Sequence, residues 1–160
     1  MKNTETNLRE EVIDFRNSFK TVVLATVSSG GAPDASYTPF TMDDNGNILI
    51  FISELAQHTQ NLIDSPTISL LWIKDEERSR NLFARQRLTL QCDARELLRD
   101  TAQWDAALSR LQDVHGKTIE VLRALPDFHL FTLEARRGNY VRGFAKAFTA
   151  QGDELRSWLT

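Results

Sequence analysis

Aromatic and basic residues alternate near the C-terminal end of the chain. Residues 139–150 (NYVRGFAKAFTA) are typical of a strand, in which side chains two positions apart share a face. One face of the strand would carry small side chains, which suits a tight barrel. The other face would carry aromatic rings that can stack on a ligand and cations that can form ion pairs with it. This pattern predicts either a binding site for a flat aromatic ligand with acidic substituents or a subunit interface. The two predictions are compatible if the ligand lies between subunits. The large side chains are Tyr140, Arg142, Phe144, Lys146 and Phe148.

The three histidines have different predicted surroundings. His58 is expected on the polar face of a helix, as a surface or interface hydrogen-bonding group or as part of a ligand pocket. His115 lies beside a predicted helix C-terminus, where a positive charge is stabilised. Asp127 and His129 share a strand face, and an acid beside an imidazole can orient it as a metal ligand. The alternative for this pair is an ordinary surface contact.

The turn around Asn45-Gly46 has features of a calcium loop. Four oxygen-bearing residues from Asp43 to Glu54 match ligand positions of that loop, but the position that needs glycine is Ile48. Asn-Gly between two strand-like runs instead predicts a β-hairpin.

The sequence has no pattern of a nucleophilic enzyme or a zinc site. Cys92, the single cysteine, follows the apolar alternation of Leu88 and Leu90, which predicts a buried side chain. There is no zinc spacing, Gly-rich phosphate loop or G-x-S-x-G elbow.

Residues 48–73 predict the unit that positions these groups. Ile48–Ser53 is expected to be a strand, Ser53 to cap a helix that ends before Pro66, and Thr67–Ile73 to be a strand buried on both faces. The crossover would bring the polar helix face close to the strand ends. Spacing assigns Leu55, Thr59, Leu62 and Ile63 to the buried stripe and Glu54, His58 and Asn61 to the polar face.

The remaining segments complete an α+β pattern of six or seven strands and three helices. Asn7 and Glu10 form a capping box for the N-terminal helix, and Thr21–Val27 is apolar on both faces. A helix is expected over residues 97–115, with Gly116 near its end. Residues 127–135 and 139–150 are expected as two strands joined through residues 136–138, and residues 153–159 as one helical turn.

Length and composition limit the possible classes of protein. At 160 residues, 41% hydrophobic and 26% charged, the chain is expected to form one domain over residues 1–160, with an N-terminal helix (1–20) and a short tail (151–160). A net charge of -3 argues against nucleic-acid binding. The sequence shows neither a signal peptide nor an apolar run of bilayer length, so no membrane association and a cytoplasmic location are expected.

Six short segments of the chain together match the pattern of a known family. In chain order they are residues 24–27 (LATV), 36–40 (SYTPF), 52–62 (ISELAQHTQNL), 82–90 (LFARQRLTL), 127–131 (DFHLF) and 140–148 (YVRGFAKAF). They resemble bacterial heme-utilisation proteins of the HutZ/HugZ type, a branch of the FMN-binding split-barrel superfamily that includes pyridoxamine-phosphate oxidase. The resemblance implies a six-stranded antiparallel split β-barrel with flanking helices, a homodimer, and a ligand site at the subunit interface.

The resemblance favours heme over FMN as the ligand. Oxidase members hold the flavin phosphate with basic side chains, and the matching positions here are Ser36, Thr41, Gln57 and His58. None carries a fixed positive charge, and each lost charge-assisted bond is worth roughly 1.5–3 kcal/mol. In the alternative, an FMN-dependent oxidoreductase, backbone amides and neutral side chains replace the cations; these are Ser53, Gln57, His58 and Asn61.

In the heme hypothesis the resemblance implies a role for each matching residue. Asp127 corresponds to an acid that hydrogen-bonds the iron-ligating histidine, and His58 and Arg87 to polar residues near that site. The family's ligating histidine comes from a C-terminal tail beyond the position of Thr160, and His129 is the alternative iron ligand within these residues. The protein would be a heme-degrading oxygenase or a non-enzymatic heme carrier. Arg87, Arg142 and Lys146 would pair with the propionates, and Tyr140 or Phe144 would pack on the porphyrin.

Overall fold

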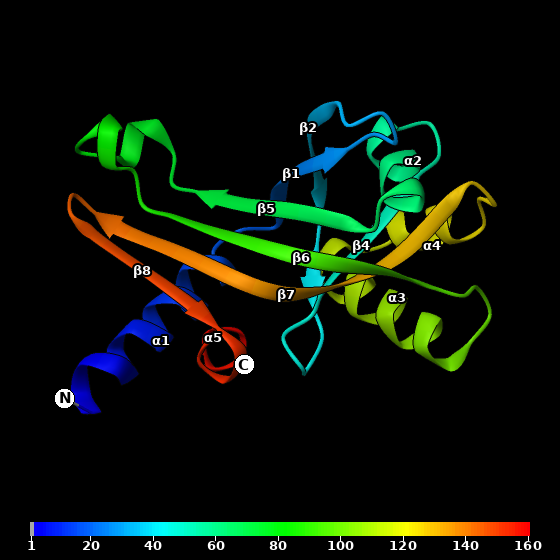
Figure 1. Cartoon of the computed structure of the whole chain (residues 1–160). Helices are drawn as coiled ribbons and strands as arrows, with labels where there is room; N and C mark the ends of the chain where they lie inside the picture. The colour runs from blue at the N-terminus through cyan, green and yellow to red at the C-terminus, as the bar shows by residue number, and fades with distance from the viewer. Residues whose placement is uncertain (1) are drawn as a thin grey trace.

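The computed structural model describes the backbone of residues 2–160 and the side chains of residues 7–160 (Figure 1). Its elements in chain order are α1 (Lys2–Asn17), β1 (Thr21–Val27), β2 (Pro33–Pro39), β3 (Thr41–Met42), β4 (Ile48–Ser53), α2 (Gln57–Asp64), β5 (Thr67–Ile73), the short η1 (Glu76–Arg78) and η2 (Leu82–Ala84), β6 (Arg87–Leu97), α3 (Ala102–His115), α4 (Thr118–Arg123), β7 (Phe128–Gly143), β8 (Lys146–Gln151) and α5 (Gly152–Leu159).

The strands form one antiparallel sheet with helices around it, which confirms the α+β prediction. The hydrogen-bonded order is β2-β1-β5-β6-β7-β4-β3, and β8 pairs with β7 beside this path. The sheet has eight strands instead of the predicted six, and its hydrogen-bonded order is open. The long strand β7 accounts for much of the difference, because its first part pairs with β4, its last part with β8, and nearly all of it with β6.

The predicted break at residues 136–138 is wrong because β7 runs through it. Gly138 is buried under α5, where a Cβ atom would lie 2.6 Å from Leu155 Cδ1. The glycine therefore allows close packing of a helix on the strand, not a turn. The chain reverses later, through Phe144 and Ala145, and Ala145 has a φ of 58°. Residues 139–150 are consequently two strands, and the predicted single face is folded back on itself.

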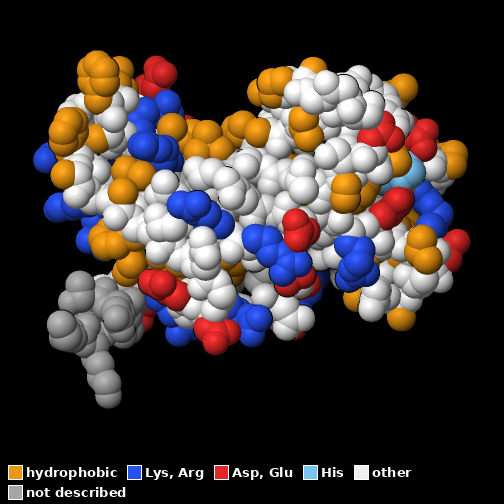
Figure 2. Space-filling view, in the orientation of Figure 1, with side chains coloured by type: hydrophobic (Ala, Val, Ile, Leu, Met, Phe, Trp, Pro, Cys, Tyr) orange, Lys and Arg blue, Asp and Glu red, His pale blue; other side chains and the backbone are white. Residues whose placement is uncertain are grey.

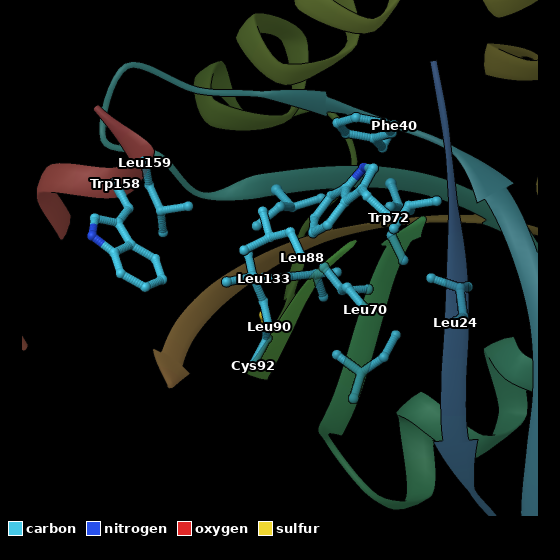
Figure 3. Close-up of a cluster of buried hydrophobic side chains, with 14 of the residues drawn as sticks. Leu24, Phe40, Leu70, Trp72, Leu88, Leu90, Cys92, Leu133, Trp158 and Leu159 are labelled. Atoms are coloured by element: carbon cyan, nitrogen blue, oxygen red, sulfur yellow. The ribbon is translucent and has the colours of Figure 1, made fainter. Parts of the chain in front are cut away.

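Two clusters of apolar side chains make up the core. The larger one is covered by α1 and α5, with Trp158 and Leu159 beside the strand residues Leu90, Cys92 and Leu133 (Figure 3). The burial of Cys92 confirms its predicted role, and burial raises the pKa of its thiol to about 12. The smaller cluster joins β4 and β7 to the helices α3 and α4.

Helix α2 differs from its prediction in start and in orientation. It begins at Gln57, and the side chain of Ser53 does not cap it. Leu55 lies in the preceding turn and is 93% exposed, and Ile63 is also exposed. His58 and Asn61, predicted on the polar face, are buried together with Thr59 and Leu62. The helix therefore presents polar groups to the rest of the protein.

Other boundaries were predicted with mixed success. Helix α1 starts at Lys2, before Asn7, and α3 starts at Ala102, because residues up to Leu97 belong to β6. Strands β1 and β5 alternate between buried and more exposed side chains, so they are not buried on both faces. The hairpin at Asn45-Gly46 and the helix end at Gly116 are confirmed. Over residues 2–160, no helix combines the length and the apolar character needed to cross a membrane.

Candidate functional site

Ser53 and Asp127 meet where β4 ends and β7 begins. The strand register pairs Ser53 with Phe128, which brings the preceding residue alongside the turn after β4. The Ser53 hydroxyl donates to Asp127 Oδ2 at 2.8 Å, and the backbone N–H of Glu54 donates to the Asp127 carbonyl at 2.9 Å. The same hydroxyl oxygen accepts from the N–H of Leu55 at 3.1 Å. Asp127 is therefore held by both its side chain and its backbone while staying partly exposed.

His58 is a buried imidazole that has no acidic hydrogen-bond partner among residues 7–160. Its Nδ1 lies 2.8 Å from the hydroxyl oxygen of Ser36 on β2. Burial lowers the pKa of His58, and the negative charge of Asp34 opposes this only in part. The side chain therefore favours the neutral form. It adds no fixed charge at this end of α2.

Gln57 and Asn61 continue the polar contacts along α2. Gln57 Nε2 donates to Asn61 Oδ1 at 3.0 Å, and Asn61 Nδ2 donates to the Thr26 hydroxyl on β1 at 3.0 Å. These bonds explain how Asn61 can be buried, because its amide is satisfied on both sides.

A cavity of about 270 Å³ lies beside these groups, between β2, β4 and the helices α3 and α4. Ser53, His58 and His115 are among the polar residues that line it, and aromatic and aliphatic side chains form much of the remainder. His115 Nε2 lies 2.8 Å from the carbonyl oxygen of Phe40, so this residue joins α3 to β2 and β3 in addition to ending a helix.

No hydrogen bond joins His129 to Asp127, although they lie two residues apart. Its Nε2 lies 2.6 Å from Glu54 Oε1, and its Nδ1 lies 2.5 Å from Glu96 Oε1. Burial lowers the pKa of His129, but the two carboxylates outweigh this and raise it overall. Both ring nitrogens are therefore engaged, and neither is free to ligate iron in this arrangement. Among residues 7–160 no group of three or more acidic, histidine or cysteine side chains forms a metal site.

Tyr140 and Arg142 form a second polar group, at the other end of β7. Glu11 of α1 accepts a 2.6 Å hydrogen bond from the Tyr140 hydroxyl and bonds of 3.0 and 2.9 Å from Arg142 Nε. Gln86 Nε2 donates to the same hydroxyl at 2.6 Å. Burial raises the pKa of Glu11, but the bonds from Arg142 and Tyr140 outweigh this and lower it overall. Tyr140 is fully buried, and burial and Glu11 raise its pKa.

The other residues at that end are more accessible. Arg87 is half-buried and donates to the Arg85 carbonyl at 3.0 Å, while Lys146 is exposed and makes no ion pair among the side chains described here. Phe144 is 70% exposed in the turn between β7 and β8. Basic and hydrophobic side chains gather at this end of the molecule, near the loop between β5 and β6 (Figure 2).

Within one chain these two groups of predicted site residues are far apart. Strand β7 has 16 residues, so at ~3.3 Å per residue its length is on the order of 50 Å. Asp127 precedes its first residue, and Tyr140 and Arg142 lie near its last. A ligand that touches both groups would require two subunits.

Sequence reasoning missed several partners in these contacts. Glu11 lies in the predicted N-terminal helix, and neither it nor Gln86 nor Glu96 was predicted to be a site residue. Ser36 had a signal, since it was compared with a phosphate-binding position, but its bond to His58 depends on tertiary packing.

Comparisons with known proteins identify the family. The model of the pyridoxamine 5'-phosphate oxidase family matches residues 8–142. The chain is 38% identical to heme oxygenase HutZ of Vibrio cholerae over 148 residues, which cover 92% of this chain and 84% of that protein. A crystal structure of HutZ, described as a heme storage protein from Vibrio cholerae, superposes with a TM-score of 0.77 at 34% identity and covers 92% of this chain and 98% of the other.

A second solved structure has the same fold over a longer chain. Campylobacter jejuni ChuZ superposes with a TM-score of 0.84 at 29% identity, covering 93% of this chain and 61% of its own. The match to HutZ confirms the resemblance on which the heme hypothesis was based. The chain belongs to the pyridoxamine 5'-phosphate oxidase family and, within it, to the HutZ type.

Proposed function

We propose that this chain is a heme-binding protein of heme-iron utilisation that degrades heme with oxygen. The relatives named heme oxygenase and heme storage protein support the ligand. The observation that carries the choice over FMN is the neutral character of the matched phosphate positions. Ser36 and His58 bond to each other, and burial favours neutral His58. A flavin phosphate would find no fixed cation there.

The active form in this proposal is a homodimer with heme at the subunit interface. The distance between the Asp127 group and the Tyr140–Arg142 group supports this, since one chain cannot bring both to one ligand. An uncovered sheet face also supports it. Val23 on β1 and Tyr37 on β2 are 40% and 68% exposed, and they line a hollow of about 530 Å³ that extends to Leu71 and Ile73 on β5.

The proposed residue roles follow from accessibility. Asp127 orients the iron-ligating histidine, which the HutZ-type pattern places in a C-terminal segment, and Ser53 holds Asp127. Arg87 and Lys146 pair with the propionates, and Phe144 packs on the porphyrin. Bound heme would supply the redox chemistry with oxygen. Arg142 and Tyr140 are tied to Glu11, so their contribution is to hold this end of the site in shape.

A hemin titration of the purified protein, with and without a C-terminal segment of the HutZ type, tests the proposal. Binding should shift and sharpen the Soret band, and a reductant with oxygen should then bleach it and release iron. An unchanged Soret band over the titration would contradict heme binding. A band that forms but does not bleach would identify a non-enzymatic carrier.

An FMN-dependent oxidoreductase is the second candidate, because the matching family model is that of a flavin enzyme. Its phosphate ligands would be Ser53, Gln57, His58, Asn61 and backbone amides. In the structure the side chain of Ser53 already donates to Asp127, and that of Gln57 donates to Asn61. Asn61 in turn donates to Thr26. A yellow purified protein that releases FMN on denaturation would favour this candidate.

Two further parts of the proposal come from the sequence. We take residues 1–160 as one split-barrel domain, which the docking of α1 on α5 supports through the bond of Arg16 Nη1 to the Leu159 carbonyl at 3.0 Å. The cytoplasmic location stays a prediction.

A further inference from the structure

The contacts of His129 join three separate segments of the chain. Glu54 lies in the turn after β4, Glu96 is on β6, and His129 is on β7 between them. An ionised carboxylate only accepts hydrogen bonds, so an imidazole bonded to two of them donates from both nitrogens as an imidazolium. The structure therefore contains an acid–imidazolium–acid bridge. Asp127, the nearest other acid along the chain, faces Ser53 instead.

This bridge is connected to Asp127 through Glu54. The side chain of Glu54 bonds His129, and its backbone N–H bonds the Asp127 carbonyl. The start of this turn is also held by Ser53, whose hydroxyl bonds Asp127 and whose carbonyl accepts from the Thr59 hydroxyl at 2.6 Å. Among residues 7–160 the side chain of Glu54 bonds only His129, and the side chain of Leu55 points into solvent. If the bridge is lost, the two carboxylates near His129 repel each other and the turn loses the ion pair of Glu54.

We infer that His129 is a positioning residue: by donating to Glu54 and Glu96, it holds the turn at residues 53–56 and, through that turn, Asp127. This inference rests on the function proposed above, in which Asp127 orients the iron ligand. It gives His129 a different role from that of an iron ligand.

Amide hydrogen exchange in the ligand-free protein tests the positioning directly. In His129→Gln the amide of Glu54 should exchange about tenfold faster or more, because its bond to Asp127 opens locally. Glu96→Gln should also speed exchange at the Glu54 amide, and it serves as the test variant if His129→Gln folds poorly. Arg136→Gln is the matched control, since Arg136 on β7 also joins β6 through its ion pair with Asp93 but lies away from the turn. Unchanged exchange at Glu54 in both test variants would overturn the inference.

A double-mutant cycle with hemin separates positioning from ligation. His129→Gln should weaken hemin binding in the wild-type background and have no further effect in Asp127→Ala, because the effect passes through Asp127. An equal loss in both backgrounds, with Glu54 exchange unchanged, would show that His129 contacts the heme itself. If the wild-type chain binds no hemin, the proposed function fails, while the exchange experiment still decides whether His129 holds the turn.

Discussion

The contacts of Arg142 show that residue type and spacing do not identify a ligand-binding cation. Arg87, Arg142 and Lys146 looked equivalent in the sequence. The guanidinium of Arg142, however, forms an ion pair with Glu11, in which Nη2 lies 2.7 Å from Oε2. Its remaining face covers the ring of Phe148, with Cζ 5.2 Å from the ring centroid. A propionate would have to displace Glu11 to reach it. Arg87 and Lys146 have no such competitor among the described side chains.

We therefore expect different effects from two arginine substitutions. Arg87→Gln should weaken hemin binding by roughly 1.5–3 kcal/mol, the value of one charge-assisted hydrogen bond. Arg142→Gln should mainly lower the free energy of unfolding, since it removes the partner of Glu11. Hemin titrations and urea unfolding of both variants measure the two effects. The opposite pattern would place Arg142 at the ligand and leave Arg87 outside it.

Glu11 should make stability depend on pH. Because the pKa of Glu11 is lowered on folding, its contribution is present above the unfolded value of about 4.3 and is lost as pH falls through the folded value. Glu11→Gln should cost about 1–3 kcal/mol at pH 7. The difference from wild type should shrink as the pH is lowered below 4. Glu10→Gln, on the exposed side of the same helix, is the control and should change little. A gap that is constant from pH 7 to pH 3 would contradict the assignment.

At the scale of elements, the sequence predicted the strands and helices better than their ends. Periodicity identified β4, β5 and the helix α3, because those segments follow a simple apolar pattern. It failed for α2, where Asn61 is buried by a side-chain bond to Thr26 that no local pattern contains. It also failed at Gly138. A glycine after two arginines looks like a turn, and only the position of Leu155 shows that it is a packing contact.

Gly138 should therefore be intolerant of a side chain. A methyl group there would lie 2.6 Å from Leu155 Cδ1 and 3.2 Å from Leu90 Cδ2, so α5 or a core leucine must move. We expect Gly138→Ala to cost about 1–3 kcal/mol of unfolding free energy through overpacking. Gly143→Ala in the same strand is the matched control, because a Cβ atom at that residue would meet no described atom within 4 Å. Equal stability of the two variants, measured by chemical denaturation, would show that the contact is not restrictive.

For the whole molecule, the resemblance predicted the arrangement more reliably than the residue patterns did. The antiparallel sheet with flanking helices follows from the HutZ-type pattern and is confirmed. The patterns along β1 and β5 looked like strands buried on both sides, whereas each has one face in the core and another more accessible. A second copy of the chain that covers this second face would explain why its side chains are apolar.

The homodimer can be tested through that face. Charges at Val23 and Tyr37, as in the double variant Val23→Lys/Tyr37→Lys, would be buried without partners in the dimer, which is strongly unfavourable. We expect wild type to have about twice the 18.2 kDa mass of one chain in light scattering, and the variant to be a monomer that has also lost hemin binding. Val121→Lys, at an exposed apolar position on α4, should leave both properties unchanged. A monomeric wild type that binds hemin would contradict the interface site, because one chain would then hold the ligand without bringing Asp127 and Lys146 together. A dimeric double variant with normal hemin binding would instead move the interface to another surface.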